Sequence, residues 1–236
     1  MIEIKNVSKT YNGKKKALKD VSFTVNNGEI FAFIGHNGAG KTTMIKSLIG
    51  ILDFEEGEIL INKKSIKDDP IACKKEMAYI PDNPDLYENM KAIDFINFVC
   101  DMYEVSQTER TKNIEKYAEM FEMQDKLNDD ISSFSHGMKQ KIALIAALAH
   151  NPEVLIMDEP FVGLDPKAVY DVKEIMHEMA KKKKTIFFST HILDVAEKLC
   201  DRVAIIKNGQ IVKCGTMKEI KGDESLEQVF LELGDK

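Results

Sequence analysis

Gly35-His36-Asn37-Gly38-Ala39-Gly40-Lys41-Thr42 stands directly after the apolar run Ile30-Phe31-Ala32-Phe33-Ile34. The unbroken apolar run predicts a strand that is buried on both faces, as in a parallel sheet. A helix is expected from Gly40 to Ile49, because Gly50 is a favourable residue just beyond a helix end. The glycine-rich stretch between strand and helix satisfies the pattern G-x-x-x-x-G-K-[ST]. This context predicts an α/β fold with a phosphate-binding loop.

Such a loop can hold a triphosphate largely through its backbone. The glycines let backbone N–H groups converge on the anion, and the helix N-terminus adds partial positive charge. Lys41 can reach the β- and γ-phosphates, and the Thr42 hydroxyl can ligate Mg²⁺. We therefore expect ATP and Mg²⁺ as cofactors. The expected nucleotide contacts in this stretch are Gly35, Asn37, Gly38, Ala39, Gly40, Lys41, Thr42 and Thr43.

A second run, Val154-Leu155-Ile156-Met157, predicts a buried strand that ends in Asp158-Glu159-Pro160. Ligands bind at the carboxyl ends of parallel strands in open α/β sheets. Asp158 is suited to hold Mg²⁺, and Glu159 is suited to polarise an attacking water as general base. An Asp-Glu pair alone is a weak signal, but a pair that follows a buried strand in a chain with a phosphate loop predicts ATP hydrolysis.

The order of patterns along the chain predicts a P-loop NTPase core with a mostly parallel sheet. Alternating residues from Ile2 to Val7 and from Val21 to Val25 predict an N-terminal antiparallel β subdomain. Apolar residues at helical spacing in Lys91–Tyr103 and Thr108–Met123 predict an inserted α-helical subdomain. The expected division of the single domain 1–236 is an antiparallel subdomain at 1–30, a core at 31–81 and 151–214, a helical insert at 82–150 and a C-terminal helical tail at 215–236.

The composition excludes several classes of protein. The chain has 236 residues, a formal net charge of −6 and four cysteines. The negative charge argues against nucleic acid as a partner, and the cysteine spacing matches no zinc pattern. The longest apolar run, Ile142 to Ala149, is far shorter than the roughly 20 residues of a spanning helix. We expect a soluble chain that reaches a membrane only through a partner.

The stretch Phe134-Ser135-His136-Gly137-Met138-Lys139-Gln140 resembles the Leu-Ser-Gly-Gly-Gln signature of the nucleotide-binding subunits of ABC transporters. It has the Gly-Met-Lys-Gln form found in bacterial exporter subunits, such as bacitracin-resistance and Ecs-type ATPases. Gly163-Leu164-Asp165 is similar to the family's loop that communicates across a dimer. Tyr11 matches the aromatic residue that stacks on adenine, and His191 matches the switch histidine that contacts the γ-phosphate. These motifs occur in the family's order over essentially the whole chain.

The resemblance implies a site shared between two subunits. Ser135 reads as a helix N-cap, so the helix that follows presents free N–H groups to an anion. In the family, this end completes the γ-phosphate site of a second subunit, which gives Ser135 and Gly137 a role in nucleotide binding. Lys41, Glu159 and His191 would be catalytic. The implied partners are a second nucleotide-binding subunit, expected as a head-to-tail homodimer, and an integral membrane permease at the cytoplasmic face of the cell membrane.

Two positions depart from the family's pattern. Asp82 stands where the family usually has a glutamine, in the loop after Ala78-Tyr79-Ile80. An aspartate can ligate Mg²⁺, so the expected metal ligands are Thr42, Asp82 and Asp158, but it cannot donate a hydrogen bond when ionised. In the signature, His136 replaces the first glycine and Met138 replaces the glutamine.

Several alternatives remain open from the sequence. Tyr11 alone would be an ordinary half-buried aromatic residue, and His191 alone a capping or core histidine. The aromatic residues of the insert, Phe95, Phe98 and Tyr103, either line a groove for a membrane subunit or form the insert's own core. A soluble ABC-type ATPase that acts in assembly or regulation is the alternative function. Substrate is not encoded in these motifs, and the resemblance to exporter subunits is the only indication of transport direction, favouring export.

Overall fold

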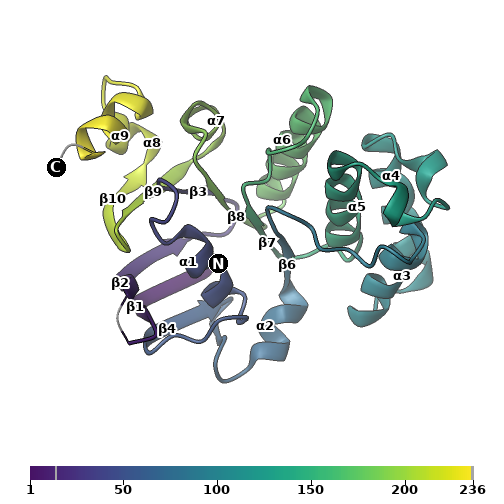
Figure 1. Ribbon diagram of the computed structural model, residues 1–236, viewed down its shortest axis with the longest axis horizontal. Helices are drawn as coiled ribbons and strands as arrows, with labels where there is room; N and C mark the ends of the chain where they lie inside the picture. The colour runs from purple at the N-terminus through teal and green to yellow at the C-terminus, as the bar shows by residue number, and fades with distance from the viewer. Residues whose placement is uncertain (14, 235–236) are drawn as a thin grey trace.

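The computed structural model describes residues 1–13 and 15–234 and contains two sheets (Figure 1). The four-stranded antiparallel sheet has the order β2-β1-β4-β5, and the six-stranded sheet has the order β10-β9-β3-β8-β7-β6. The strands are β1 (Ile2–Tyr11), β2 (Lys15–Val25), β3 (Ile30–Ile34), β4 (Glu56–Ile61), β5 (Lys64–Ser65), β6 (Met77–Ile80), β7 (Val154–Asp158), β8 (Thr185–Thr190), β9 (Arg202–Lys207) and β10 (Gln210–Thr216).

The six-stranded sheet is parallel from β9 through β3, β8 and β7 to β6, and β10 joins β9 in antiparallel fashion. This confirms the predicted α/β fold with a mostly parallel core sheet. The helices are α1 (Lys41–Leu48), α2 (Pro70–Glu76), α3 (Ala92–Met102), α4 (Gln107–Met120), α5 (His136–Ala149), α6 (Pro166–Lys181), α7 (Leu193–Leu199), α8 (Met217–Lys221) and α9 (Leu226–Gly234), with short 3₁₀ turns at Gln124–Lys126 and Ile131–Ser133.

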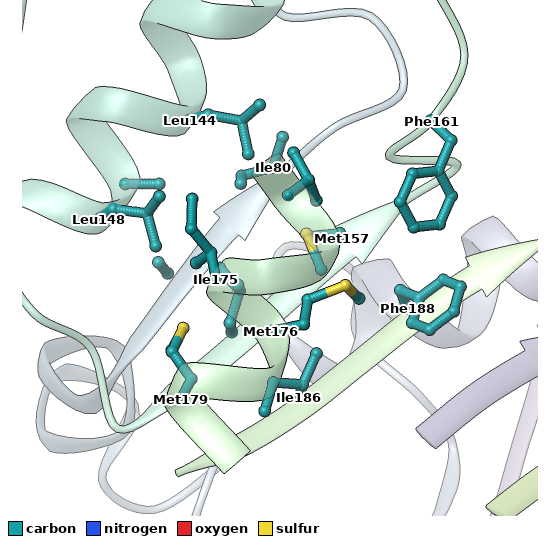
Figure 2. Packing of buried hydrophobic residues seen from close by; sticks show 14 of the residues in the cluster. Ile80, Leu144, Leu148, Met157, Phe161, Ile175, Met176, Met179, Ile186 and Phe188 are labelled. Carbon is teal, nitrogen blue, oxygen red and sulfur yellow. The ribbon is translucent and has the colours of Figure 1, made fainter. Parts of the chain in front are cut away.

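Strand β3 is buried on both faces, as its unbroken apolar run predicted. Ile30, Ala32 and Ile34 belong to a core cluster with α5 and α6, whereas Phe31 and Phe33 belong to a second cluster between the two sheets. Figure 2 shows part of the first cluster, in which side chains of α5 and α6 pack on β6, β7 and β8. The labelled residues there are Ile80, Leu144, Leu148, Met157, Phe161, Ile175, Met176, Met179, Ile186 and Phe188.

The antiparallel sheet is larger than the sequence suggested. It takes in β4 and β5, from residues 56–65, in addition to strands from residues 1–30. The segment Glu56–Ile61 begins with three exposed residues, and burial starts only at Ile59, so its alternation is too short to recognise. Strands β1 and β2 are also longer than predicted, because the register shifts near Asn6 and Asp20, both at positive φ, break the alternation.

The helical insert and the C-terminal helices lie at opposite ends of the molecule (Figure 1). Helices α3, α4 and α5 pack together at one end, and α8 and α9 lie at the other. Residues 235–236 of the expected helical tail lie outside the described residues. None of the helices in 1–13 and 15–234 has the length and apolarity that crossing a membrane demands.

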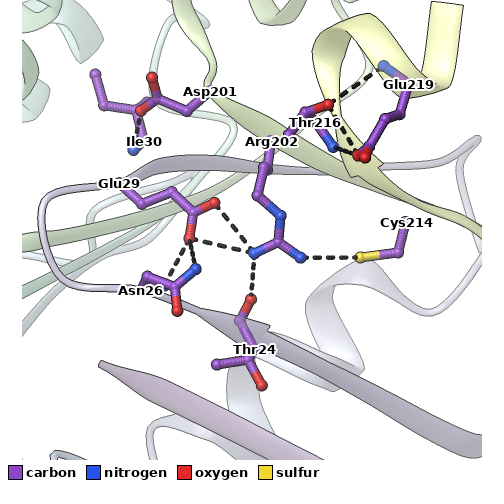
Figure 3. A network of polar contacts seen from close by, with 9 residues as sticks. All are labelled: Thr24, Asn26, Glu29, Ile30, Asp201, Arg202, Cys214, Thr216 and Glu219. Atoms are coloured by element: carbon purple, nitrogen blue, oxygen red, sulfur yellow. Dashed lines mark hydrogen bonds and ion pairs between the residues drawn. The ribbon is translucent and has the colours of Figure 1, made fainter.

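A partly buried polar network joins the two sheets (Figure 3). The Arg202 guanidinium, on β9, donates to Glu29 Oε1 at 3.1 Å and to the Thr24 carbonyl oxygen at 2.9 Å. Glu29 is buried at 6% exposure, so its charge needs this partner. The Ile30 N–H donates to Asp201 Oδ2 at 2.9 Å. These bonds fix where β3 begins, and therefore where the loop at its carboxyl end lies.

Candidate nucleotide-binding site

A cleft of about 530 Å³ lies over the loop between β3 and α1. Its lining comes from the loop, from β2, from the carboxyl end of β7 and from the turn between β9 and β10. The lining residues are Tyr11, Lys16, Ala17, Lys19, His36, Asn37, Gly38, Gly40, Lys41, Thr42, Thr43, Asp82, Asp158, Glu159, Asn208 and Gly209. The structure thus brings together most of the nucleotide and metal residues predicted from sequence.

The loop requires glycine where the chain passes close to itself. A Cβ on Gly35 would lie 2.7 Å from the Ile206 carbonyl oxygen. Gly40, at φ 119°, leaves no room either, because a Cβ would lie 2.7 Å from the Ala17 carbonyl oxygen. Helix α1 begins directly afterwards at Lys41. Its first N–H groups have no partner within the helix, so they face the cleft as anion donors.

Lys41 links the loop to the acidic strand end. Its side chain is 7% exposed, and Nζ donates to the Gly35 carbonyl oxygen at 2.7 Å. The same Nζ lies 3.4 Å from Glu159 Oε1. A cation held at this point between loop and carboxylate is placed to contact terminal phosphate oxygens.

Asp158 and Thr42 form an oxygen-donor pair at the base of the cleft. Thr42 Oγ1 donates to Asp158 Oδ2 at 3.1 Å, and the Ser189 hydroxyl donates to Asp158 Oδ1. Among residues 1–13 and 15–234, no group of three or more His, Cys, Asp or Glu side chains could hold a metal by itself. The donor set that is present, one carboxylate and one hydroxyl, suits Mg²⁺, which protein sites usually hold through one or two carboxylates together with substrate phosphates and water.

Glu159 is held in place at several points. Its N–H donates to the Ser189 carbonyl oxygen at 3.1 Å, and Oε2 accepts from the His191 N–H at 3.2 Å. His191 Nδ1 lies 2.9 Å from the same Oε2. The Glu159 side chain is 11% exposed, whereas that of His191 is 54% exposed. Two of the three residues predicted to be catalytic, Glu159 and His191, are therefore in direct contact, with the histidine on the solvent side.

Asp82 lines the same cleft as Asp158 and Glu159. Partial burial, followed by the charges of Asp158 and Glu159, raises the pKa of Asp82 above its usual value, while His136 and His191 act in the opposite direction. Burial, with smaller contributions from Asp158 and Asp82, raises the pKa of nearby Tyr79 to about 12. Asp82 therefore adds a third carboxylate to the acidic end of the cleft, and a bound cation would relieve the repulsion among the three.

Tyr11 lies at the opposite end of the cleft, and its hydroxyl is 3.5 Å from Thr43 Oγ1. The side chain of Tyr11 is 39% exposed, which leaves a ring face accessible to a base. Sequence reasoning missed the residues beside it: Lys16, Lys19, Asn208 and Gly209. The Asn208-Gly209 turn signal was visible, but its contact with the loop, through a bond from Gly209 N–H to the Ala39 carbonyl oxygen at 2.9 Å, was not.

Ser135 and Gly137, both in the described part of the chain, do not line this cleft. Ser135 caps α5, where its Oγ accepts from the Met138 N–H at 3.3 Å. Gly137 packs on the loop after β7, and a Cβ there would lie 2.8 Å from the Gly163 carbonyl oxygen. Asp165 Oδ1 accepts from the Ala168 N–H at 2.9 Å and so caps α6. The start of α5 is therefore exposed, and it lies outside the cleft of its own chain.

Comparison with known proteins identifies relatives over the full length. The family model described as "ABC transporter" matches residues 18–162. EcsA of Bacillus subtilis (strain 168), an ABC-type transporter ATP-binding protein, is 35% identical over 238 residues, which cover 99% of this chain and 96% of EcsA. The linearmycin resistance ATP-binding protein LnrL of the same organism is 33% identical over 220 residues, which cover 93% of this chain and 70% of LnrL.

Solved structures agree in fold. A structure of an ATP-binding subunit of an ABC transporter matches with a TM-score of 0.96 at 36% identity, over 99% of both chains. A dimeric ATP-binding cassette in a post-hydrolysis state, bound to ADP and Pi, matches with a TM-score of 0.83 at 26% identity, over 92% of this chain and 99% of the other.

Proposed function

The chain belongs to the ATP-binding subunits of ABC transporters and hydrolyses ATP to drive transport, and we propose that it does so as half of a head-to-tail dimer on a membrane exporter. The observation that carries the catalytic part is the arrangement of Glu159. This carboxylate is nearly buried, faces Lys41 across 3.4 Å and contacts His191 across 2.9 Å. A general base needs such a fixed position within hydrogen-bond reach of the proton that it takes from the attacking water.

Each residue of the cleft has a proposed task. Lys41 and the N–H groups of the Gly35–Thr43 stretch bind the phosphates, and Tyr11 stacks on adenine. Glu159 accepts the proton of the attacking water, and His191 orients the water and the γ-phosphate from the solvent side. Thr42 and Asp158, with Asp82 beside them, would hold Mg²⁺. When bound there, Mg²⁺ supplies charge neutralisation for the phosphate oxygens.

The dimer is proposed because the cleft of one chain does not contain all the residues that the resemblance assigns to the nucleotide site. Ser135 and Gly137 lie outside the cleft of their own chain, and the start of α5 presents N–H groups to solvent. A second copy placed head to tail would bring these donors to the γ-phosphate. A relative of similar fold is a dimer with ADP and Pi, which supports this arrangement.

We further propose a separate role for each of the segments expected from the sequence. Residues 31–81 and 151–214 would hold ATP, and the insert 82–150 would face a membrane subunit at the cytoplasmic side of the cell membrane. Export is favoured over import by the Gly-Met-Lys-Gln form of the signature, through its resemblance to exporter subunits. Nucleic acid is not a proposed partner, given the net charge of −6.

The test uses the membrane protein encoded beside this chain. The two proteins are co-purified and reconstituted into proteoliposomes, and ATP is supplied on the face that carries this chain. We expect a stable complex and ATP-dependent movement of a lipophilic or peptide probe away from that face, and we expect Lys41→Ala to abolish it. Movement toward that face would contradict export. Failure to form a complex with any polytopic membrane protein would favour the soluble assembly ATPase instead.

A further inference from the structure

His136 is the first residue of α5, at the position where the family's signature usually has a glycine. Its imidazole lies against Gly163, in the loop that joins β7 to α6. A Cβ on Gly163 would lie 2.6 Å from His136 Cδ2 and 3.0 Å from Nε2. The ring therefore fills the space that a side chain at position 163 would need. Gly163 also has a φ of 79°, which favours glycine on its own account.

Two further contacts join the same segments. Gly137 follows His136 and approaches the Gly163 carbonyl oxygen so closely that a Cβ would lie 2.8 Å away. One helical turn later, Lys141 Nζ lies 2.8 Å from Asp165 Oδ2, and the Lys141 side chain is only 15% exposed. The start of α5 is thus tied to the loop 159–165 at three successive points. The ring of His136 is the contact among these that a glycine in the usual signature would not make.

The loop is also rigidly joined to Glu159. The Val162 N–H donates to the Glu159 carbonyl oxygen at 3.2 Å. Between them, Phe161 is buried and packs edge-on against Phe188 of β8, with ring centroids 5.7 Å apart. A displacement of the loop at Gly163 therefore changes the position of Glu159.

We propose that His136 is a positioning residue that makes the start of α5 and the loop 159–165 move as one unit. This proposal rests on the proposed dimer. There, Ser135 and Gly137 of one subunit meet the ATP of the other. His136 links this signature, which contacts the ATP held by the partner, to Glu159, which acts on the ATP held by its own chain. Binding of the signature to the first ATP therefore positions the base at the second ATP. The two sites are then coupled through each chain as well as across the interface.

A steric experiment on the isolated chain tests the contact itself. Gly163→Ala forces the ring of His136 away, so the decrease in Tm that this substitution causes includes the loss of the contact. In a His136→Ala background this part of the cost is absent. We expect the loss of Tm caused by Gly163→Ala to be larger in the wild-type background by roughly 2–4 °C. Gly13→Ala is the matched control, because Gly13 has a φ of 66° and open space around it, and its cost should be equal in both backgrounds. An equal decrease in Tm for Gly163→Ala in both backgrounds would show that His136 does not make this contact.

A functional experiment on the reconstituted transporter tests the coupling. We expect His136→Ala to lower the Hill coefficient for ATP from about 2 toward about 1 and to reduce kcat. The dissociation constant for ATP of the isolated chain should change by less than about twofold, because His136 does not line the cleft. His177→Ala, on the exposed face of α6, is the control and should change neither value.

The outcomes separate the two proposals. An unchanged Hill coefficient in His136→Ala, with a cooperative wild type, would overturn the relay and leave the dimer standing. A wild-type complex with a Hill coefficient of about 1 would overturn the coupling between the two sites and with it the relay, whereas the dimer itself is tested by the molar mass of Glu159→Gln with ATP. The Tm experiment would still report on the contact between His136 and Gly163 in that case.

Discussion

Glu159 has a φ of 47°, in the left-handed region that residues with a side chain rarely adopt. Such a conformation costs roughly 1–3 kcal/mol and persists only where surrounding bonds impose it. Here the bonds come from Ser189 and His191. The backbone turns sharply after Asp158, so that Asp158 stays buried and accepts from the exposed Thr42 hydroxyl, while the next carboxylate faces Lys41. A single strained residue therefore separates the proposed metal ligand from the proposed general base.

Replacing Glu159 with Gln tests the basic role. The amide keeps the shape and can still accept from the His191 N–H, but it cannot take a proton from water. We expect the rate of ATP hydrolysis by the assembled complex to fall by about 10²–10⁴-fold, with ATP binding retained. Glu174→Gln, exposed on α6, should hydrolyse ATP at the wild-type rate. Normal turnover by Glu159→Gln would show that another group is the base.

Asp82 gives a second prediction at this scale. If it is a working Mg²⁺ ligand, Asp82→Ala should raise the Mg²⁺ concentration needed for half-maximal ATPase activity by roughly tenfold or more. Asp82→Asn, which keeps the shape but loses the charge, should show a smaller change in the same direction. Asp68→Ala, exposed before α2, is the control. A titration of activity against Mg²⁺ in the complex measures all three, and identical curves would exclude Asp82 from the metal site.

The residues of the cleft differ in how far the sequence reveals them. The phosphate loop and the Asp158-Glu159 pair follow two buried strands of one parallel sheet, so their meeting at its carboxyl edge was predictable. Lys16 and Lys19 were not predictable. They reach the cleft because the Lys19 N–H donates to the Gly209 carbonyl oxygen at 2.8 Å, which fixes the β9–β10 turn on β2. No local pattern encodes a contact between segments 190 residues apart.

At the scale of elements, long or strongly patterned segments were predicted and short ones were missed. β3, β7 and α5 have unbroken or periodic apolar residues, and each formed where expected. α2 has seven residues and buries only Cys73, so its periodicity is too weak to detect. Its identity as a helix depends on Asp69, whose Oδ1 accepts from the Ala72 N–H at 3.2 Å, and on Pro70 at the first turn.

The junction between α5 and β7 contains a partly buried histidine. His150 stacks on Tyr103 with ring centroids 3.7 Å apart, and the Tyr103 hydroxyl donates to the Met77 carbonyl oxygen at 3.2 Å. This stack connects the ends of α3 and α5 to β6. Burial lowers the pKa of His150 from 6.5 to about 4. The folded chain therefore keeps this imidazole neutral at pH values where an unfolded chain would protonate it.

The stability of the chain should consequently depend on pH. Between about pH 6.5 and pH 4 the unfolded state binds a proton that the folded state does not, so stability is full above pH 6.5 and falls as the pH is lowered. The loss from this residue is on the order of 3 kcal/mol. We expect His150→Phe, which keeps the stack, to flatten the decline of unfolding free energy from pH 7 to pH 5. His177→Phe, at an exposed position, should leave it unchanged. Parallel slopes for His150→Phe and wild type would refute this.

At the scale of the whole molecule, the two core clusters meet along β3, which contributes alternate residues to each. One cluster includes the helices of the insert, and the other includes α1 and the antiparallel sheet. The nucleotide cleft lies where β3 ends, so the phosphate loop follows directly on the strand that both clusters share. The sequence predicted the main strands and helices that form these two clusters, because the hydrophobic period and the length of a segment are local properties. It predicted the second half of the site only through resemblance, since that half would come from another copy.

The last prediction concerns that second copy. The affinity of the isolated chain for ATP should not depend on protein concentration, because each chain has its own cleft. ATP turnover per chain should rise with protein concentration, because the proposed site needs Ser135 and Gly137 of a partner near the γ-phosphate. Glu159→Gln stops hydrolysis, so with ATP it should accumulate as a dimer that ADP does not support. Adding Ser135→Arg, which places a bulky side chain at the exposed start of α5, should restore the monomer. Light scattering after size-exclusion chromatography measures both states. A monomer in Glu159→Gln with ATP, at concentrations where the complex is active, would mean that each cleft works alone, and the exposed start of α5 would then need another explanation.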